Sequence, residues 1–112
     1  MEQEKVIIAS VYYKDDDGIN RVTSTWAVTM ESIESFTHMY KDCAHRMEIK
    51  KAVVWRKDDE GSYQGKRRVY IVSGKTSGGQ SYRKCFNCFE SVFEWVEDMK
   101  VESFDIRKAV IM

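Results

Sequence analysis

A seven-residue segment of this chain occurs twice, each time after an amphipathic helical pattern. Residues 48–54 read EIKKAVV and residues 105–111 read DIRKAVI. At the starts of the two helical patterns, residues 31–33 (ESI) match residues 90–92 (ESV), with a two-residue gap between helix and strand. Internal similarity of this kind restricts the fold to architectures in which one supersecondary unit occurs twice. An amphipathic strand after a helix can also read this way without any duplication.

The remaining strand patterns complete each half of the chain. Residues 5–13 are rich in β-branched and aromatic types, and residues 21–30 alternate between apolar and polar side chains. Residues 66–73 and 82–86 occupy the corresponding places in the second half. Each half therefore reads strand, strand, helix, strand.

From this order we expect one α+β domain spanning residues 1–112. It should contain a largely antiparallel sheet of about six strands with two helices on one face. If the similarity is a true duplication, the repeats are residues 5–57 and 66–112, and two ββαβ units pack about a pseudo-twofold axis.

Apolar residues at three- and four-residue steps predict both helices. The first should run from about Glu31 to Met47, with Thr29 or Ser32 as its N-cap. Its buried stripe comprises Ile33, Phe36, Tyr40, Ala44 and Met47. The second helix should begin with a capping box at Asn87 and Glu90. Its buried stripe comprises Phe89, Val92, Phe93, Val96 and Met99.

Glycine and acidic clusters punctuate the chain, which contains no proline. Residues 15–18 (DDDG) and 58–61 (DDEG) predict hairpin-like reversals. A last strand is expected at residues 104–111. Apolar residues on both faces of strands 5–13 and 49–55 suggest that a partner covers part of the sheet, and a second copy of the chain is one candidate.

Charge and length exclude several classes of protein. Eighteen basic residues balance eighteen acidic ones, so no overall field attracts the chain to nucleic acid or to an anionic membrane. The acidic start MEQE and the lack of a long apolar run predict neither a signal peptide nor a membrane span, so we expect a cytoplasmic protein. Three cysteines without a secretion signal do not indicate a disulfide framework.

The motif with inherent chemistry is Cys85-Phe86-Asn87-Cys88, a CxxC at the start of a predicted helix. There the helix dipole would lower a thiol pKa, as redox chemistry requires. A structural zinc site would need a second pair of ligands, Cys43 and His45, beside Cys85 and Cys88. The alternative is that the cysteines pack as small apolar residues at a strand-to-helix junction.

A basic segment interleaved with tyrosines is the best sequence argument for nucleic acid. Cations and rings on one surface would contact phosphates and stack on the bases of a single strand. The candidate residues are Lys66, Arg67, Arg68, Tyr70, Lys75, Tyr82, Arg83 and Lys84. Alternating charges on an exposed strand can equally be a solvated face that protects the sheet edge.

No catalytic constellation, phosphate-binding loop or cofactor fingerprint occurs in the sequence. We therefore expect no enzyme and no cofactor, but a small binding or regulatory protein that acts on another macromolecule, most simply a protein. Inhibitors, immunity proteins and accessory factors of viruses or mobile elements are proteins of this type. A single-stranded nucleic-acid binder and a thiol-redox or zinc protein are the alternatives.

Overall fold

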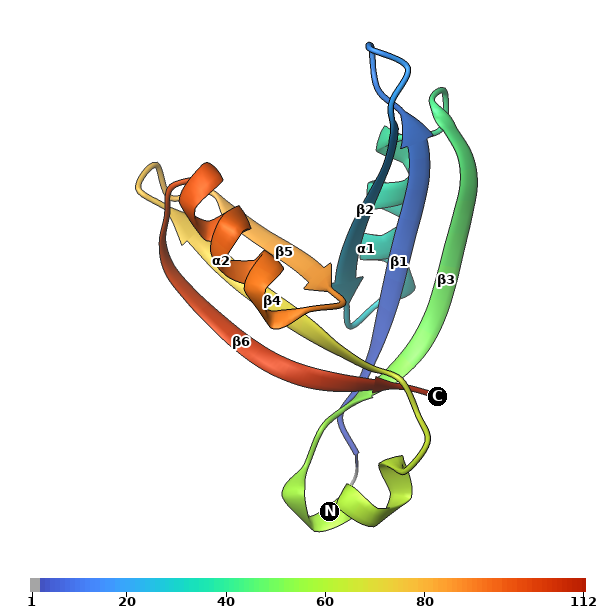
Figure 1. Cartoon of the computed structure of the whole chain (residues 1–112), viewed down its shortest axis with the longest axis vertical. Helices are drawn as coiled ribbons and strands as arrows, with labels where there is room; N and C mark the ends of the chain where they lie inside the picture. The colour runs from blue at the N-terminus through green and yellow to red at the C-terminus, as the bar shows by residue number, and fades with distance from the viewer. Residues whose placement is uncertain (1–2) are drawn as a thin grey trace.

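The computed structural model describes residues 3–112, which form six strands, two α-helices and one 3-10 helix, η1 (Figure 1). In chain order the elements are β1 (Lys5–Lys14), β2 (Asn20–Ala27), α1 (Met30–Met39), β3 (Ala44–Val54), η1 (Lys57–Tyr63), β4 (Arg68–Thr76), β5 (Ser81–Phe86), α2 (Phe89–Asp98) and β6 (Val101–Ile111). Among these residues, neither α-helix has the length and apolar character needed to cross a bilayer.

All six strands form one antiparallel sheet in the order β2-β1-β3-β6-β4-β5. This confirms the expected α+β domain with a single antiparallel sheet. The sheet is nevertheless split into two lobes, because its central strands β3 and β6 pair only over Ala52–Val54 and Ala109–Ile111. In Figure 1 the lobes rise from this junction like the arms of a V. We call them the N-terminal unit (β1, β2, α1, β3) and the C-terminal unit (β4, β5, α2, β6).

The two units share their strand registers. Val6 pairs with Ala52 in the N-terminal unit, and Val69 pairs with Ala109 in the C-terminal unit. Across the junction Val53 faces Val110, so residues 52–54 of one unit pair with residues 109–111, their equivalents in the other unit. The helices Met30–Met39 and Phe89–Asp98 also match in length. The spatial equivalences agree with the sequence alignment of the two halves, while the duplication itself stays a prediction.

The alternation of side chains along each strand separates two faces of the sheet. One face, inside the V, holds a core of Val6, Ile8, Trp26, Ala52, Val54, Val69, Ile71, Cys85 and Ala109. The opposite face carries α1 over β1 and β2, and α2 over β4, β5 and β6. Both helices therefore lie on one face, as predicted. The chain itself covers the apolar middle of β1 and the end of β3, so their apolarity does not require a partner.

Trp26 ties the inner sides of the units together. Its indole Nε1 donates to the carbonyl of Val72 at 3.0 Å, and the guanidinium of Arg83 lies 4.8 Å from its ring centre. Next to it, the hydroxyl of Thr25 donates to the Arg83 carbonyl at 2.7 Å. These contacts hold β2 against β5, the two strands at the ends of the sheet order. Thr25 is thus buried at a contact between the two units.

The first helix ends earlier than its sequence pattern predicts. Thr29 is the N-cap, as expected, and Ile33 is fully buried. The helix stops at Met39, however, and Ala44 and Met47 belong to β3. Strand β3 pairs with β1 along nearly its whole length. That ladder satisfies the backbone of residues 44–49, which in isolation have a helix-like apolar spacing.

The second helix begins at Phe89, and its N-cap is Cys88 without a side-chain cap hydrogen bond. The predicted capping box at Asn87 and Glu90 is therefore wrong, because Asn87 uses its side-chain oxygen to accept from Arg67. Only Val92 of the expected stripe is buried. Phe89, Phe93 and Met99 remain roughly half exposed, since Trp95 also reaches toward the sheet beside Phe86.

The acidic cluster at residues 58–61 is not a hairpin turn. It lies in η1, which connects β3 to β4, and β6 is inserted between those two strands. Tyr63 closes this connection, since its buried ring packs with Val53 and Val110 at the junction of the units. The backbone N–H of Arg56 donates to the Tyr63 hydroxyl at 3.2 Å. By contrast, residues 15–18 form the predicted β1–β2 hairpin.

Candidate functional site: two clefts and two free strand edges

The predicted basic and aromatic surface is divided between the two faces of the C-terminal unit. Tyr70 packs on Phe89, and Tyr82 packs edge-on against Trp95, so both rings lie on the helix side. Arg83 lies over Trp26 on the inner side. Although β4 and β5 are hairpin neighbours, their rings and cations do not form one stacking platform. Lys66 and Arg68 are exposed, and Arg67, Lys75, Arg83 and Lys84 line clefts described below.

The four candidate thiol or zinc ligands are also distributed over different places. Cys43 is exposed in the turn before β3, and His45 is exposed at the start of β3. Cys85 is buried in the inner core, and Cys88 is exposed at the start of α2, where its Sγ lies 3.0 Å from the Ser91 hydroxyl. Within residues 3–112, no group of three histidine, cysteine or carboxylate side chains is placed to hold a metal ion.

Burial controls the chemistry of the CxxC segment. It raises the pKa of the Cys85 thiol from 9.0 to about 12, against smaller opposing effects of Arg67 and Lys84. A thiol in that range is protonated at neutral pH and is a poor nucleophile. Cys85 therefore acts as a small core side chain in this position, the alternative that the sequence left open.

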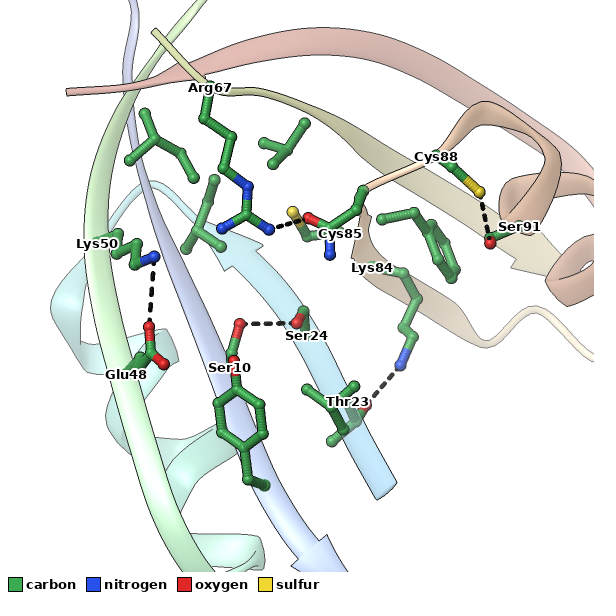
Figure 2. Close-up of a pocket in the computed structure, with 17 residues that line it drawn as sticks. Ser10, Thr23, Ser24, Glu48, Lys50, Arg67, Lys84, Cys85, Cys88 and Ser91 are labelled. Atoms are coloured by element: carbon green, nitrogen blue, oxygen red, sulfur yellow. Dashed lines mark hydrogen bonds and ion pairs between the residues drawn. The ribbon is translucent and has the colours of Figure 1, made fainter. Parts of the chain in front are cut away.

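The CxxC segment borders a cleft of about 420 Å³ inside the V (Figure 2). We call it the first cleft. Strands β1, β2 and β3 of the N-terminal unit form one wall, and the residues around the β5–α2 turn form the other. Its polar lining consists of Ser10, Tyr12, Thr23, Ser24, Glu48, Lys50, Arg67, Lys84, Asn87, Cys88 and Ser91. Ile8, Val69, Cys85 and Ile111 contribute its apolar part.

Two cations enter the first cleft without a carboxylate partner. The Arg67 guanidinium donates to the side-chain oxygen of Asn87, and Lys84 Nζ donates to the Thr23 hydroxyl at 2.6 Å. Both acceptors are neutral. None of the ion pairs of the described chain includes Arg67 or Lys84. Burial lowers the pKa of Lys84, since the ammonium group loses water there.

The single carboxylate of the first cleft is already neutralised. Glu48 on β3 lies 3.3 Å from Lys50 and also pairs with Arg46. Hydrogen bonding from Lys50, more than any other interaction, lowers the pKa of Glu48. On the neighbouring strands, the hydroxyls of Ser10 and Ser24 are 2.7 Å apart and can each rotate to donate or accept. Figure 2 shows Glu48 and Lys50 at the left of the cleft, Lys84 at the right, and Arg67 above the Ser10–Ser24 pair.

A second cleft, of about 520 Å³, lies on the inner face of the C-terminal unit. Residues of β4, β5 and β6 line it, namely Ser73, Gly74, Lys75, Ser81, Tyr82, Arg83, Ser103, Phe104 and Asp105. Both clefts thus lie on the inner side of the sheet, and each contains residues of the basic segment.

The strands at the centre of the sheet order also leave long edges without a neighbour. β1 pairs with one side of β3, and β4 pairs with one side of β6. On their other sides β3 and β6 pair with each other over three residue pairs and then diverge (Figure 1). Residues 44–50 of β3 and 101–107 of β6 therefore have an unpaired edge.

No local sequence pattern indicates the first cleft. Ser10, Ser24 and Lys50 come from three strands, and only the register of β1 against β2 and β3 brings them together. Strand alternation does place Glu48 and Lys50 on one side of β3 with Ala52, which is a partial signal. The free edges follow from the short β3–β6 junction, which no periodicity encodes.

Comparison with known proteins gives no relative for this arrangement: no protein-family model, no curated protein and no solved structure matches the chain. Fold and site together define a six-stranded α+β protein with two inner clefts and two free strand edges.

Proposed function

We propose that this chain is a non-enzymatic binding protein that acts on another protein, whose extended segment adds a strand to a free edge of its sheet. The observation that carries the proposal is the divergence of β3 and β6, which leaves the edges of residues 44–50 and 101–107 unpaired. An unpaired edge presents backbone donors and acceptors in the arrangement that an added strand requires.

The register identifies which residues offer these groups. On β3, the backbone groups that point toward the junction belong to Lys51 and Val53, and the Met112 N–H donates to the Lys51 carbonyl. On β6 they belong to Lys108 and Val110, and the Trp55 N–H donates to the Lys108 carbonyl. In an antiparallel strand this direction alternates from residue to residue. The free groups therefore belong to Met47 and Ile49 on one edge and to Phe104 and Ile106 on the other. His45 and Glu102 lie at register shifts, where this alternation is interrupted.

The side chains beside these free groups fit a protein partner. Met47, Ile49 and Phe104 are large apolar side chains on these two strands, and they are 40%, 50% and 39% exposed. An added strand would give its main-chain hydrogen bonds to the edge and its alternate side chains to these apolar residues. Nucleic acid offers no such backbone ladder.

The non-catalytic part of the proposal is supported by the groups in the clefts. Neither His38 nor His45 lines the first or the second cleft, and the buried Cys85 has its pKa raised to about 12. The carboxylate of Glu48 is held between two cations. A regulatory or inhibitory role would then arise from occupying the partner's segment.

A site-specific photo-crosslinking experiment tests this function in cells that make the protein. A photoreactive side chain at Met47 or Phe104 should join the chain to a partner protein, and the same group at Val28 should not. Val28 is a matched control, because it is exposed and apolar but lies outside the strands. The partner is then prepared separately, and hydrogen exchange is measured in the complex. We expect slower exchange at the amides of residues 47 and 49, or of residues 104 and 106.

Substitution at the edge provides the second arm. Met47→Pro removes an N–H that points away from β1, so the β1–β3 ladder should survive while the added strand loses a donor. Binding of the partner should weaken about tenfold or more. Equal capture by Val28, or a complex with unchanged exchange at both edges, would contradict the proposal. Capture of a second copy of the chain, with a mass that rises with concentration, would identify the partner as the chain itself.

A further inference from the structure

We propose that the first cleft binds a small organic phosphate, with its phosphate group between Arg67 and Lys84 and its organic part against the apolar side of the cleft. Glu48 and Lys50 of β3 line the cleft, but Arg67 and Lys84 lie outside the free edges of β3 and β6, so the proposal does not depend on the strand-addition function. The argument rests on how the two cations are held and on the size of the cleft that they line.

Each cation is fixed by a neutral oxygen, so its position is defined while its charge stays uncompensated. Asn87 accepts from Arg67, and Thr23 accepts from Lys84. Charged side chains in partly buried places are normally paired with an opposite charge, because removing water from an isolated charge is unfavourable. Lys84 has lost part of its water, as its lowered pKa indicates, and no carboxylate of the described chain replaces it.

The charge balance favours a dianion over a monoanion. Glu48, the single carboxylate in the lining, already has Lys50 and Arg46 as partners. Two positive charges then remain, at Arg67 and Lys84. A phosphate monoester carries about −1.5 to −2 charges at pH 7, whereas a carboxylate carries one. The Ser10 and Ser24 hydroxyls, 2.7 Å apart, are donors for further phosphate oxygens.

The volume favours an organic phosphate over the free ion. The cleft measures about 420 Å³, within the range of roughly 300 to 1,000 Å³ that small-molecule sites occupy. A phosphate group alone would leave most of that space empty. Tyr12, Val22 and Phe86 also line the cleft and offer contact surface for an attached ring or chain.

Binding of phenyl phosphate to the intact chain tests the site at constant ionic strength. Calorimetry and amide chemical shifts should show saturable binding at the first cleft, tighter than the binding of inorganic phosphate or benzoate. Benzoate has the same ring with one negative charge, so it should bind about tenfold or more weakly. Affinity for phenyl phosphate should also fall as the pH drops below about 6, where the phosphate becomes a monoanion.

Neutral variants connect the binding to the two cations. Arg67→Gln and Lys84→Met should each weaken phenyl phosphate binding about tenfold or more, because each removes a charge-assisted hydrogen bond. Arg68→Gln and Lys51→Met are the matched controls, since both residues are exposed and belong to the opposite face of the sheet. They should leave the affinity within about twofold, well below the tenfold loss of one such bond.

Three results would overturn the proposal. Binding that never saturates, or that the two controls weaken as much as the two cleft variants, would indicate non-specific charge attraction. Equal affinity for benzoate would exclude selection of a dianion. If Lys84→Met proved unfolded by circular dichroism, Arg67→Gln would still decide the question, because Arg67 is exposed and its side chain is not part of the core.

Discussion

The N-terminal and C-terminal units have the same strand registers but fill equivalent positions differently. Ile8 pairs with Trp26 in the N-terminal unit, and the equivalent Ile71 pairs with Cys85. A single large side chain thus crosses the inner space between the units, and the small thiol on the opposite strand leaves room for it. Two identical units could not both place a tryptophan there. The difference indicates that the inner core depends on asymmetry between the units.

A second difference lies on the helix side. Val11 in β1 pairs with Met47, and Gly74 in β4 pairs with the equivalent Phe104. The helices that cover these positions have Phe36 in α1 and Trp95 in α2 at matching places. In the C-terminal unit a larger helix side chain therefore accompanies the smallest strand residue. The ring of Trp95 thus occupies space that a side chain at position 74 would need.

The largest expected effect comes from removing the tryptophan between the units. Trp26→Ala should lower the free energy of unfolding by about 3–5 kcal/mol, because Trp26 is 4% exposed and the smaller side chain leaves a cavity. Urea unfolding measures the change. Trp26→Phe is the control, since it keeps most of the packing and loses chiefly the bond to the Val72 carbonyl. A loss below about 1 kcal/mol for Trp26→Ala would show that the units hold together without this contact.

The next largest effect tests the glycine on the helix side. Gly74→Ala should cost about 1–3 kcal/mol, because the new Cβ would lie 2.9 Å from Val101 Cγ1 and 3.3 Å from Trp95 Cη2. Trp95→Phe should recover part of this loss, since it removes the ring atoms that the new methyl group meets. A double-mutant cycle in urea measures the coupling. Gly61→Ala is the control, because nothing lies within 4 Å of its added Cβ. If the losses of unfolding free energy in the two single variants simply add in the double variant, the packing of Trp95 does not depend on the glycine at position 74.

The sequence could predict these elements but not their asymmetry. Alternation and helical spacing located all six strands and both helices, because those patterns depend on which side chains face the core. The helix end at Tyr40 was missed, since Ala44 and Met47 continue the helical spacing while belonging to β3. Only the long β1–β3 ladder decides between the two conformations, and that ladder joins residues far apart in the chain.

The sites could be predicted only in part for the same reason. Arg67, Lys84, Cys85 and Cys88 were candidates from local sequence, and they do line one cleft. Their roles there depend on Thr23 and Asn87, which hold the cations, and Thr23 lies on a strand of the other unit. A pattern of alternating cations and rings within one segment cannot predict these contacts, because they form only when the fold brings β2 against β5.

Cys85 occupies the position equivalent to Trp26, and its thiol has a smaller, pH-dependent effect on folding stability. Its pKa is 9.0 when exposed and about 12 in the folded chain, so the unfolded chain releases the proton first. Folding stability is therefore full below pH 9 and falls as the pH rises toward 12. At pH 10 the loss amounts to about 1.4 kcal/mol. The lowered pKa of Lys84 acts in the opposite direction, because stability gained from that group increases as the pH rises toward 10.5.

Urea unfolding of the wild-type chain and Cys85→Ala at pH 8 and pH 10, under reducing conditions, separates the two groups. Lys84 is common to both proteins, so their difference reports the thiol. The wild type should lose more stability than Cys85→Ala over this interval. Cys88→Ala is the control and should follow the wild type, because Cys88 is exposed. Equal pH dependence of wild type and Cys85→Ala would mean that the thiol is hydrated in the folded chain.

The smallest expected effect concerns the starts of the two helices. α1 has a side-chain cap, since Thr29 Oγ1 accepts from the Ser32 N–H at 3.4 Å, and α2 has none at Cys88. Thr29→Ala should therefore cost about 0.5–1 kcal/mol, while Cys88→Ala should change stability by only a few tenths. Cys88→Asp should stabilise by about 0.5–1 kcal/mol, because the carboxylate can accept from the free N–H groups of the first turn. Thermal unfolding at neutral pH measures all three variants. If Cys88→Asp fails to stabilise, those N–H groups already have a partner, and the two helix starts differ less than their side chains indicate.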